Sequence, residues 1–353
     1  MKVKIGGLTK IKTGKLDANA SSDDGKYPFF TCSKDALKIS TYSYDCECVL
    51  VAGNGDLNVK YYNGKFDAYQ RTYIIQSNGS GKLYIPYLYY FMERYVEELR
   101  KQAIGGVIKY IKLENLTDAL IELPPINEQK AIVKILKKAK NILYMHKNEM
   151  GDLDNLIKAR FVEMFGEGLV DDGRFPLLPI SDIGRVVSGA TPKTGNADYW
   201  EGNNIWITPA ELAEKSFVIY DSIRKITDEG VRSCAVNLLP IGTVILSSRA
   251  PIGKVAIVGT PMYCNQGFKN IIPNKKINST YLYELLSMQT GYLNSLGRGA
   301  TFKEISKQIV ENIKVKVPPM ELQNEFADFV NQVDKSKFVL QKKFQIIHYS
   351  DII

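Results

Sequence analysis

An internal repeat constrains the fold of this chain more than any other feature of its sequence. The segment Leu123–Gln129 (LPPINEQ) returns 194 positions later as Val317–Gln323 (VPPMELQ). Two more pairs of segments keep the same offset: Tyr87–Tyr89 with Tyr281–Tyr283, and Gly105–Ile111 with Gly299–Ile305. Three matches in one register are hard to obtain by chance, and self-similarity at a fixed period indicates a duplicated unit. The sequence therefore predicts two diverged copies of one unit, related by a pseudo-twofold axis.

Farther upstream the two copies still correspond, although the register drifts by a residue or two. Val49–Val51 corresponds to Val244–Leu246, and Gln70 corresponds to Gln266. After a larger gap, Lys12–Gly14 parallels Val187–Gly189. Each copy is therefore expected to consist of a globular part followed by a long helix.

The long helices follow the two proline pairs. From about Asn127 to Phe165 the chain contains no proline and a single glycine, Gly151. Apolar residues recur there every three or four positions, which is the pattern of one apolar stripe on a helix. The second copy repeats this pattern from about Leu322 to the C-terminus. At about 1.5 Å per residue, each helix would be on the order of 50 Å long.

A helix of this length with one apolar stripe needs a partner, and its own copy is the obvious one. Paired apolar stripes form coiled coils. Because a whole globular unit lies between the two helices, an antiparallel pairing is favoured. Gly151 and the polar residues His146 and Glu149 would weaken the middle of the pair. His146 is interpreted as a polar residue that sets the register, in preference to a ligand.

The globular parts combine short apolar strands with few helices. Strands are expected at 49–52, 72–76, 244–248 and 255–258, and helices at 87–100 and 280–293. The predicted fold class is α+β: two domains with twisted sheets, separated by two long antiparallel helices that form a coiled coil. The expected domains are 1–125 and 173–318, and the expected spacer helices are 126–166 and 319–353.

The composition of the chain excludes some classes of protein but does not identify one. The formal net charge of +8 permits binding to nucleic acid but does not show it. The five cysteines form no Cys-x-x-Cys pair, which favours reduced thiols in a cytosolic protein. The sequence has no apolar stretch that could span a membrane and no apolar segment typical of a signal peptide. We therefore expect a cytoplasmic protein with no membrane partner, and the two histidines are too few to suggest a metal site.

The sequence also lacks the motifs of common catalytic sites. Gly79–Lys82 (GSGK) matches only part of a phosphate-binding loop, because Leu83 follows where that motif has serine or threonine. There is no Gly-x-Gly-x-x-Gly motif and no Asn-Pro-Pro-aromatic tetrapeptide of the kind that amino-methyltransferases use. The two histidines, His146 and His348, suggest no hydrolase triad. We expect no catalytic residues and no cofactor. The absence of these motifs does not exclude a nuclease site built from scattered acidic residues and a lysine.

Three features together resemble a known family and cover almost the whole chain. The first is the phrase at 123–133 (LPPINEQKAIV), which leads into a helix ending in ARFVEMFG at 159–166. The second is the series Ser188–Pro192, Ile205–Pro209 and Asn265–Gly267. The third is the repeated order of globular domain and helix. In this order and spacing the chain resembles the specificity subunits of type I restriction–modification systems.

The resemblance implies separate roles for the globular parts and the helices. Each globular part would be a target-recognition domain that reads one half of a split site in double-stranded DNA. The helices would fix the distance between the halves and dock two adenine methyltransferase subunits, which carry S-adenosylmethionine. Whether a restriction or translocase subunit also joins is left open. Because the two copies have diverged, the half-sites should differ and the whole site should be asymmetric.

Two alternative functions stay open, and the chain differs from the family's pattern in one respect. A stand-alone DNA-binding or scaffold protein without a methyltransferase partner is the second reading, and a self-contained enzyme is the third. The second spacer helix stops at Ile353, near the position equivalent to Ala159, and has no counterpart of 160–166. The sequence therefore does not decide whether the two chain ends contact each other, or whether one of the two methyltransferase docking sites is present.

Candidate DNA contacts are polar and basic residues in loops beside glycines, because base edges are read by Arg, Lys, Asn, Gln or acids placed in a groove. In the first copy these are Lys12, Lys15, Asn54, Lys60, Gln70, Arg71 and Lys109. In the second copy they are Thr191, Lys193, Arg249, Lys254, Gln266, Lys269, Arg298 and Lys303. Lys109 and Lys303 are equivalent across the repeat and are expected to contact phosphates in preference to bases. For each residue taken alone, a solvated surface position is an equal alternative.

Overall fold

The computed structural model describes residues 2–212, 217–249, 251–299 and 303–350, with side chains as far as residue 342. The chain divides into two compact units, Met1–Tyr144 and Met145–Ile353, called here the first unit and the second unit. The boundary falls inside the long helix α3 (Ile126–Phe165). Within the described residues, no helix is both long enough and apolar enough to cross a membrane.

The first unit is built on a six-stranded sheet with the order β2-β7-β5-β6-β3-β4. Neighbouring strands are antiparallel, except for the parallel pair β3 and β6. The strands are β2 (Thr9–Thr13), β3 (Tyr27–Phe30), β4 (Leu37–Ile39), β5 (Tyr44–Ala52), β6 (Val59–Ala68) and β7 (Thr72–Ser77). A separate antiparallel pair consists of β1 (Lys2–Lys4) and β8 (Leu120–Glu122). The short helix α2 (Leu113–Thr117) precedes β8.

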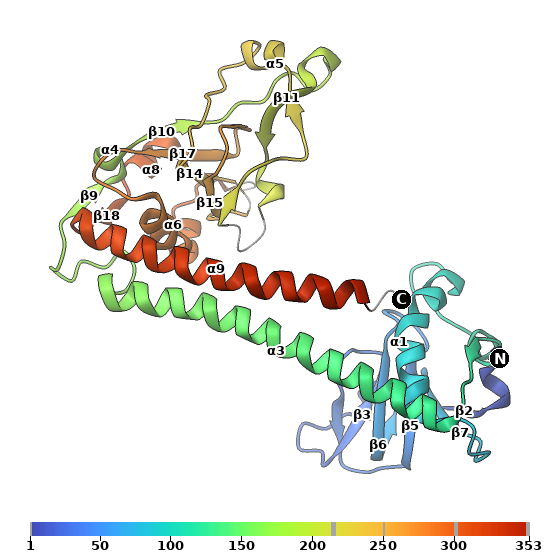
Figure 1. Cartoon of the computed structure of the whole chain (residues 1–353). Coiled ribbons are helices and arrows are strands. Elements are labelled where there is room, and N and C mark those ends of the chain that lie inside the picture. The colour runs from blue at the N-terminus through green and yellow to red at the C-terminus, as the bar shows by residue number, and fades with distance from the viewer. Residues whose placement is uncertain (1, 213–216, 250, 300–302, 351–353) are drawn as a thin grey trace. The chain divides into compact units, whose positions relative to one another are not determined.

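The helix α1 (Ile85–Gln102) covers one face of this sheet (Figure 1). Its buried residues recur at intervals of three or four, namely Leu88, Met92, Val96 and Leu99. They share a core with Val49 and Val51, which point to the same face because side chains alternate along a strand. The α1 helix thus contains the whole of the helix expected at 87–100.

The second unit contains a five-stranded sheet with the order β10-β17-β14-β15-β12 and a three-stranded sheet with the order β13-β11-β16. The larger sheet comprises β10 (Gly184–Ser188), β12 (Val218–Ile219), β14 (Val244–Ser247), β15 (Val255–Val258) and β17 (Phe268–Pro273). The smaller sheet comprises β11 (Trp200–Ile207), β13 (Lys225–Ile226) and β16 (Tyr263–Cys264). A strand pair, β9 (Leu177–Pro179) with β18 (Lys314–Lys316), is the counterpart of β1 and β8.

Most helices of the second unit are short. They are α4 (Ile180–Ile183), α5 (Asp228–Arg232), α6 (Ser279–Ser287), α7 (Thr290–Ser295) and α8 (Lys307–Glu311), followed by the long α9 (Met320–Ser350). The described residues of the two units also contain four 3₁₀ turns: η1 (Ile5–Gly7), η2 (Ala18–Ala20), η3 (Ala197–Tyr199) and η4 (Pro209–Glu211). The prediction of a single helix at 280–293 is wrong. The chain leaves the helical conformation at Gln289, with φ −107° and ψ 21°, so that α6 and α7 are separate.

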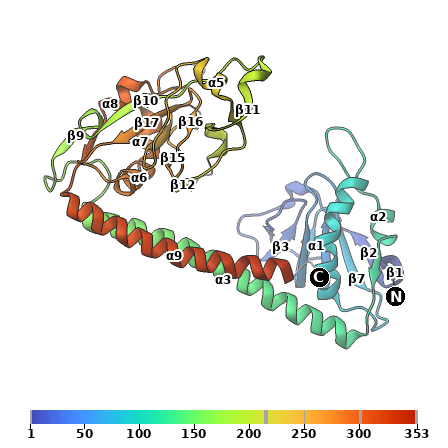
Figure 2. The same ribbon diagram turned by 45° about the horizontal axis from the view of Figure 1, so that its top comes forward.

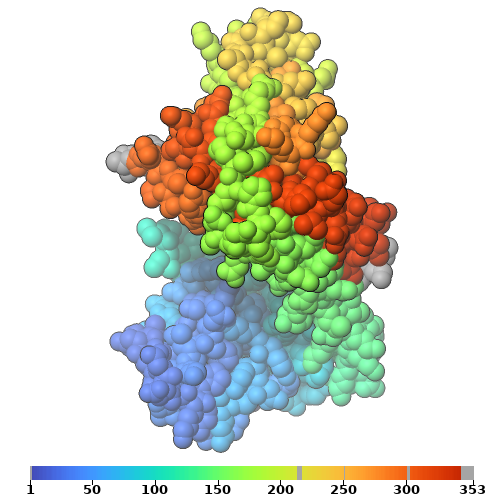
Figure 3. Space-filling view, turned by 90° about the vertical axis from the view of Figure 1, so that its left-hand side faces the viewer, coloured from blue at the N-terminus to red at the C-terminus, as the bar shows by residue number. Residues whose placement is uncertain are grey.

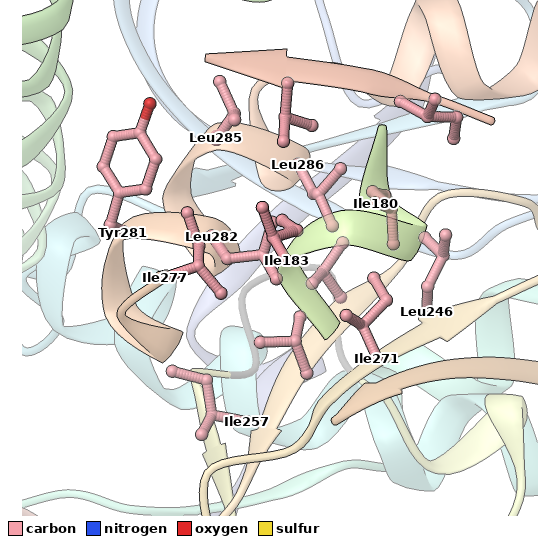
Figure 4. Close-up of a cluster of buried hydrophobic side chains, with 14 of the residues drawn as sticks. Ile180, Ile183, Leu246, Ile257, Ile271, Ile277, Tyr281, Leu282, Leu285 and Leu286 are labelled. Carbon is pink, nitrogen blue, oxygen red and sulfur yellow. The ribbon is translucent and has the colours of Figure 1, made fainter. Parts of the chain in front are cut away.

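The core of the second unit lies between α4, α6 and the larger sheet. In Figure 4, Ile180 and Ile183 of α4 lie beside Leu246 of β14 and Ile271 of β17. The apolar side chains of α6 complete the cluster: Tyr281, Leu282, Leu285 and Leu286. All of these residues are essentially inaccessible to solvent. Burial of this apolar surface is the main force that holds α6 on the sheet.

Inside the second unit, the part of α3 that follows Met145 runs antiparallel to α9, and the two helices lie side by side in Figures 1 and 2. The ring centroids of Phe161 and Phe165 lie 5.3 and 5.6 Å from that of Phe326. Farther along, the Lys337 ammonium lies 2.9 Å from the Asp154 carboxylate. Late residues of α3 therefore contact early residues of α9, which confirms the predicted antiparallel pairing here. Figure 3 shows both helices at the surface of the second unit.

The repeat is visible in the structure as a buried glutamine at the start of each long helix. In α3, Gln129 donates hydrogen bonds of 2.8 Å to the carbonyls of Lys82 and Pro124, and it accepts one from the amide of Tyr84. In α9, Gln323 makes the three equivalent hydrogen bonds. Its amide nitrogen donates to the carbonyls of Lys276 (3.1 Å) and Pro318 (2.7 Å), and its oxygen accepts from the amide of Asn278 (2.8 Å).

Every partner in these two glutamine sites is displaced by the same 194 positions as the sequence repeat. A tyrosine pair follows the same rule, because Tyr87 donates to the carbonyl of Glu122 and Tyr281 donates to the carbonyl of Lys316. Both glutamines are completely buried. A buried side-chain amide that is hydrogen-bonded to three backbone groups fixes the position of the helix relative to the loops that it bonds. Each long helix therefore leaves its globular part at a defined point.

A charged pocket of about 140 Å³ lies between α6 and the long helices of the second unit. Its charged lining residues are Asp154, Lys158, Glu284, Asp334 and Lys337. Lys337 bonds both Asp154 and Asp334, whereas Glu284 is 7% exposed. Burial raises the pKa of Glu284 to about 7. The aspartates add to this rise in the pKa, and the two lysines oppose it.

We expect Glu284→Gln to stabilise the second unit above pH 7. Between the ordinary carboxyl pKa of 4.5 and the folded pKa of about 7, the unfolded chain releases a proton that the folded chain keeps. Stability should therefore fall as the pH rises through this window, and the variant should lack that slope. Both tryptophans lie in the second unit, so their fluorescence during urea unfolding at pH 5.5 and pH 8 measures the effect. The exposed Glu167→Gln is the control, and identical pH slopes in wild type and Glu284→Gln would contradict the prediction.

Candidate nucleic-acid interface

In the first unit, three strands end or begin at one edge of the sheet. The strands β2 and β5 end there at Thr13 and Ala52, and β7 begins there at Thr72. The register pairs Thr13 with Tyr73 and Ala52 with Thr72. We call this the strand-end edge of the first unit. Its loops are bonded together, because Gly14 donates to the carbonyl of Thr72 and Gly53 donates to that of Arg71.

The second unit has an equivalent strand-end edge. The strands β10 and β14 end there at Ser188 and Ser247, and β17 begins there at Phe268. The amide of Ser248 donates to the carbonyl of Gly267 over 2.8 Å, which is the counterpart of the Gly53 bond in the first unit. The two edges are therefore built from equivalent strand ends, and one loop-to-loop hydrogen bond is equivalent in both.

A glycine makes the closest approach of backbones possible at each edge. A Cβ atom at Gly14 would lie 2.2 Å from the carbonyl oxygen of Ala68, and one at Gly189 would lie 2.0 Å from that of Asn265. These distances are impossible for a side-chain carbon. The correspondence of Gly14 with Gly189 in the sequence therefore reflects a steric requirement at both edges.

The candidate residues of the first copy gather at or beside its strand-end edge. Exposed are Lys12, Lys15, Gln70, Arg71 and Lys109. Asn54 is partly buried, two residues after the end of β5. Lys60 is also partly buried, near the start of β6, and its ammonium donates to the side chain of Asn58. Burial lowers the pKa of Lys60, so this lysine is the least available of the group.

The candidate residues of the second copy gather in the same way. Exposed are Lys193, Arg249, Gln266, Arg298 and Lys303. Thr191 is partly buried, and its hydroxyl bonds the side-chain oxygen of Gln266, which ties two loops of the edge together. Lys254 is partly buried, and its ammonium donates to the carbonyl of Leu212 over 2.6 Å.

The expectation that Lys269 contacts DNA does not fit this structure. Its side chain is only 8% exposed, and its ammonium lies 3.2 Å from the carboxylate of Glu304 and 3.3 Å from the hydroxyl of Ser248. The other oxygen of Glu304 accepts from Arg249 over 3.1 Å. Partial burial raises the pKa of Glu304, but its two cationic partners lower it further, so the net shift is downward. Lys269 thus holds Glu304 ionised, and Glu304 orients the exposed guanidinium of Arg249.

Sequence reasoning missed a second cluster beside this edge. The guanidinium of Arg224 lies 3.8 Å from the ring centroid of Trp200, and the two tryptophan rings meet edge to face at 5.1 Å. The indole of Trp206 donates to the carbonyl of Ala190, and that of Trp200 donates to the carbonyl of Lys193. The cluster therefore fixes the loop that carries Thr191 and Lys193. The motif at 205–209 had signalled Trp206, but nothing in the sequence linked it to Arg224.

A glycine and a hydrogen-bonded backbone pair adjoin each strand-end edge, and in the first unit the pair closes a hairpin. In the first unit Ile104 and Tyr110 exchange hydrogen bonds of 3.0 and 2.8 Å, and in the second Arg298 and Glu304 exchange bonds of 3.0 and 2.9 Å. Gly105 and Gly299 have φ values of 117° and 125°, which favour glycine. Each pair also bridges to the second residue after the central strand, because Tyr110 bridges to Asn54 and Glu304 bridges to Arg249.

The chemistry of the two edges suits a polyanion. The exposed candidate residues at the two edges are lysines, arginines and glutamines. The nearby carboxylates of Asp56 and Glu304 are each held by two cations. Within the described residues, no group of three or more His, Cys, Asp or Glu side chains is arranged to hold a metal ion, and all five cysteines are free. The fold thus defines a class of protein with two equivalent, basic and polar binding edges.

Comparison with known proteins agrees with this class. The sequence model of the family described as "Type I restriction modification DNA specificity domain" matches residues 1–150 and 177–347. The chain therefore belongs to this family. Its role is to supply DNA-sequence specificity within a type I restriction–modification system.

Individual relatives support the assignment. The chain is 28% identical over 367 residues to the type I restriction enzyme EcoDI specificity subunit of Escherichia coli, covering 94% of this chain and 80% of that protein. It is 38% identical over 186 residues to the MjaIX specificity subunit of Methanocaldococcus jannaschii, but this match spans only 51% of the chain and 43% of the relative. The S subunit from M. genitalium shares the fold, with a TM-score of 0.65 at 18% identity over 99% of this chain and 93% of that one.

Proposed function

We propose that each strand-end edge reads one half of a bipartite, asymmetric site in double-stranded DNA. The observation that carries the proposal is the gathering of the candidate contacts at structurally equivalent edges of two repeated units. Exposed lysines and arginines would neutralise phosphates, and the arginine and amide side chains between them would reach base edges. In this role the chain selects the sequence, and methylation or cleavage belongs to other subunits.

The two edges should prefer different half-sites because equivalent positions carry different side chains. Asn54 and Arg249 follow equivalent strands and make equivalent backbone bridges, to Tyr110 and Glu304 respectively. Asparagine is suited to adenine and arginine to guanine. The side chains of these bridge partners differ as well, since Tyr110 corresponds to Glu304. These differences support an asymmetric site.

We further propose that the long helices dock two adenine methyltransferase subunits, with a restriction subunit as a further partner. The described part of these helices keeps large apolar side chains in solvent: Ile135, Ile142, Tyr144, Met145, Leu156, Phe338 and Val339. Apolar surface of this extent is typical of protein interaction sites. We propose a cytoplasmic location, since the DNA and the partner subunits lie there.

Mapping of adenine methylation across a host genome tests the proposal. The host carries the chain with its methyltransferase, and a matched host lacks the chain. A split, asymmetric motif that is methylated only in the first host is the expected result. Methylation that persists after removal of the chain would show that another protein directs it. Sequence-specific DNA binding by a chain that engages no methyltransferase would favour a stand-alone binding protein.

We expect the double variant Lys109→Ala/Lys303→Ala to weaken DNA binding equally for all sequences. Each lysine that contacts a phosphate releases about one counterion, so the double variant should reduce the slope of log K against log salt by about 2. Binding titrations of the complex at several salt concentrations measure the slope. The control is Lys10→Ala/Lys275→Ala, which removes two exposed lysines from the opposite ends of the same sheets. An unchanged slope in Lys109→Ala/Lys303→Ala would show that neither lysine contacts phosphate.

A further inference from the structure

The hairpin of the first unit presents apolar side chains to solvent at its tip. Val107 is fully exposed and Ile108 is 62% exposed, although both side chains are aliphatic. We call the segment Ile104–Tyr110 the finger. In Figure 2 the loop that follows α1 stands clear of the sheet. Exposed aliphatic residues at the tip of a loop gain nothing for folding, so their position calls for a binding partner.

The finger is held rigidly at its base. Two backbone hydrogen bonds join Ile104 to Tyr110, and the amide of Gly55 donates to the carbonyl of Lys109 over 2.9 Å. A Cβ atom at Gly105 would lie 2.6 Å from the carbonyl oxygen of Ile108, so only glycine fits this tight bend. Because its base is fixed on both sides, the finger presents Val107 and Ile108 in a defined place.

The surroundings of the tip indicate which partner it meets. Lys109 and Lys112 are exposed on either side of Tyr110, and Arg71 lies at the neighbouring edge. Asn54, a candidate base reader, bridges directly to the finger at Tyr110. A purely apolar protein surface would leave these charges without partners. A DNA duplex offers phosphates for the cations and stacked bases for the aliphatic tip, so it satisfies both.

We propose that the finger wedges Val107 and Ile108 between two stacked base pairs beside the first half-site and opens that step. Apolar side chains inserted in this way partly unstack DNA and bend it. The inference rests on the proposed function, because it needs the strand-end edge to bind DNA. The equivalent tip of the second copy, residues 300–302, lies outside the described residues, so the proposal concerns the first half-site.

The test compares the wild-type complex with the double variant Val107→Ser/Ile108→Ser. The probes are duplexes that contain the mapped methylation motif, with 2-aminopurine placed at successive steps in and beside the first half-site. A pair of dyes at the duplex ends reports bending by energy transfer. In the wild type we expect a severalfold rise in 2-aminopurine fluorescence at one step, together with a bend. The variant should lose both signals.

The variant should lose the DNA deformation but keep most of its affinity, because the wedge contacts in the wild type are offset by the cost of unstacking. We expect a rise in Kd of less than about tenfold, as contacts and cost disappear together. The control Leu37→Ser removes a different exposed aliphatic side chain of the first unit and should leave every signal unchanged. Since Val107 makes no buried contact, the variant should fold as the wild type does, which thermal unfolding checks.

The outcomes separate this proposal from the one on which it rests. Sequence-specific binding with no 2-aminopurine signal at any step would overturn the wedge and leave the proposed function standing. Equal signals in wild type and variant would also overturn it. A complex that binds no motif at all would overturn the proposed function, and the wedge with it.

Discussion

Replacing Arg249 with alanine should relax the choice of one base pair in the second half-site and leave the other positions unchanged. The side chain is half exposed at the strand-end edge, and Glu304 holds its guanidinium in one orientation. An arginine presented in this way matches the two acceptors of guanine. Loss of such a contact costs about 1–3 kcal/mol of discrimination against the wrong base, or roughly 5-fold to 150-fold.

Competition binding with duplexes that vary each position of the motif in turn measures this effect. Arg185→Ala is the matched control, because Arg185 is exposed near the opposite end of the same sheet. Uniform weakening across all sequences would show that Arg249 contacts phosphate and reads no base. Glu304→Gln, which keeps the shape but removes the charge, should loosen the same position of the motif. It should not affect the positions read by the first unit.

Replacing Gln323 with leucine should lower the free energy of unfolding of the second unit by about 2–4 kcal/mol. The variant leaves the carbonyls of Lys276 and Pro318 and the amide of Asn278 without their partner in a fully buried place. Each buried group that loses its hydrogen bond costs about 1–3 kcal/mol, and partial relaxation reduces the sum.

Urea unfolding followed by tryptophan fluorescence reports this change, because both tryptophans belong to the second unit. The control is Gln332→Leu, which changes an exposed glutamine of the same helix and should alter stability by less than about 0.5 kcal/mol. A loss below 1 kcal/mol in Gln323→Leu would mean that water or a rearranged loop replaces the missing bonds. Gln129→Leu should destabilise the first unit for the same reason.

The large elements of the fold could be predicted because their signals are periodic or repeated. The proline pairs and apolar stripes predicted helices from 127 and 322, and the structure begins them at Ile126 and Met320. The repeat predicted which residues correspond, and the two buried glutamines occupy equivalent sites. The break between α6 and α7 escaped prediction, since Leu293, the buried residue of α7, continues the helical spacing of the buried residues of α6.

The interface was harder to predict than the fold because its contacts join distant residues. The loops at 14–15, 53–54 and 70–71 meet only when β2, β5 and β7 pair. Reasoning from residue type grouped Lys269 with the exposed lysines. The structure shows instead that it neutralises Glu304, a residue 35 positions away. No local pattern distinguishes these two roles of a lysine.

At each strand-end edge the backbone positions the loops, and the exposed side chains are not needed for this. The separation has a consequence for how the sequence of such a protein can evolve. The loops are positioned by backbone hydrogen bonds and by the close approach at Gly14 and Gly189, whereas the exposed candidate readers contribute little to folding. Substitutions at exposed positions usually alter stability by less than about 0.5 kcal/mol. A new target sequence can therefore arise one side chain at a time, while every intermediate remains folded and able to assemble.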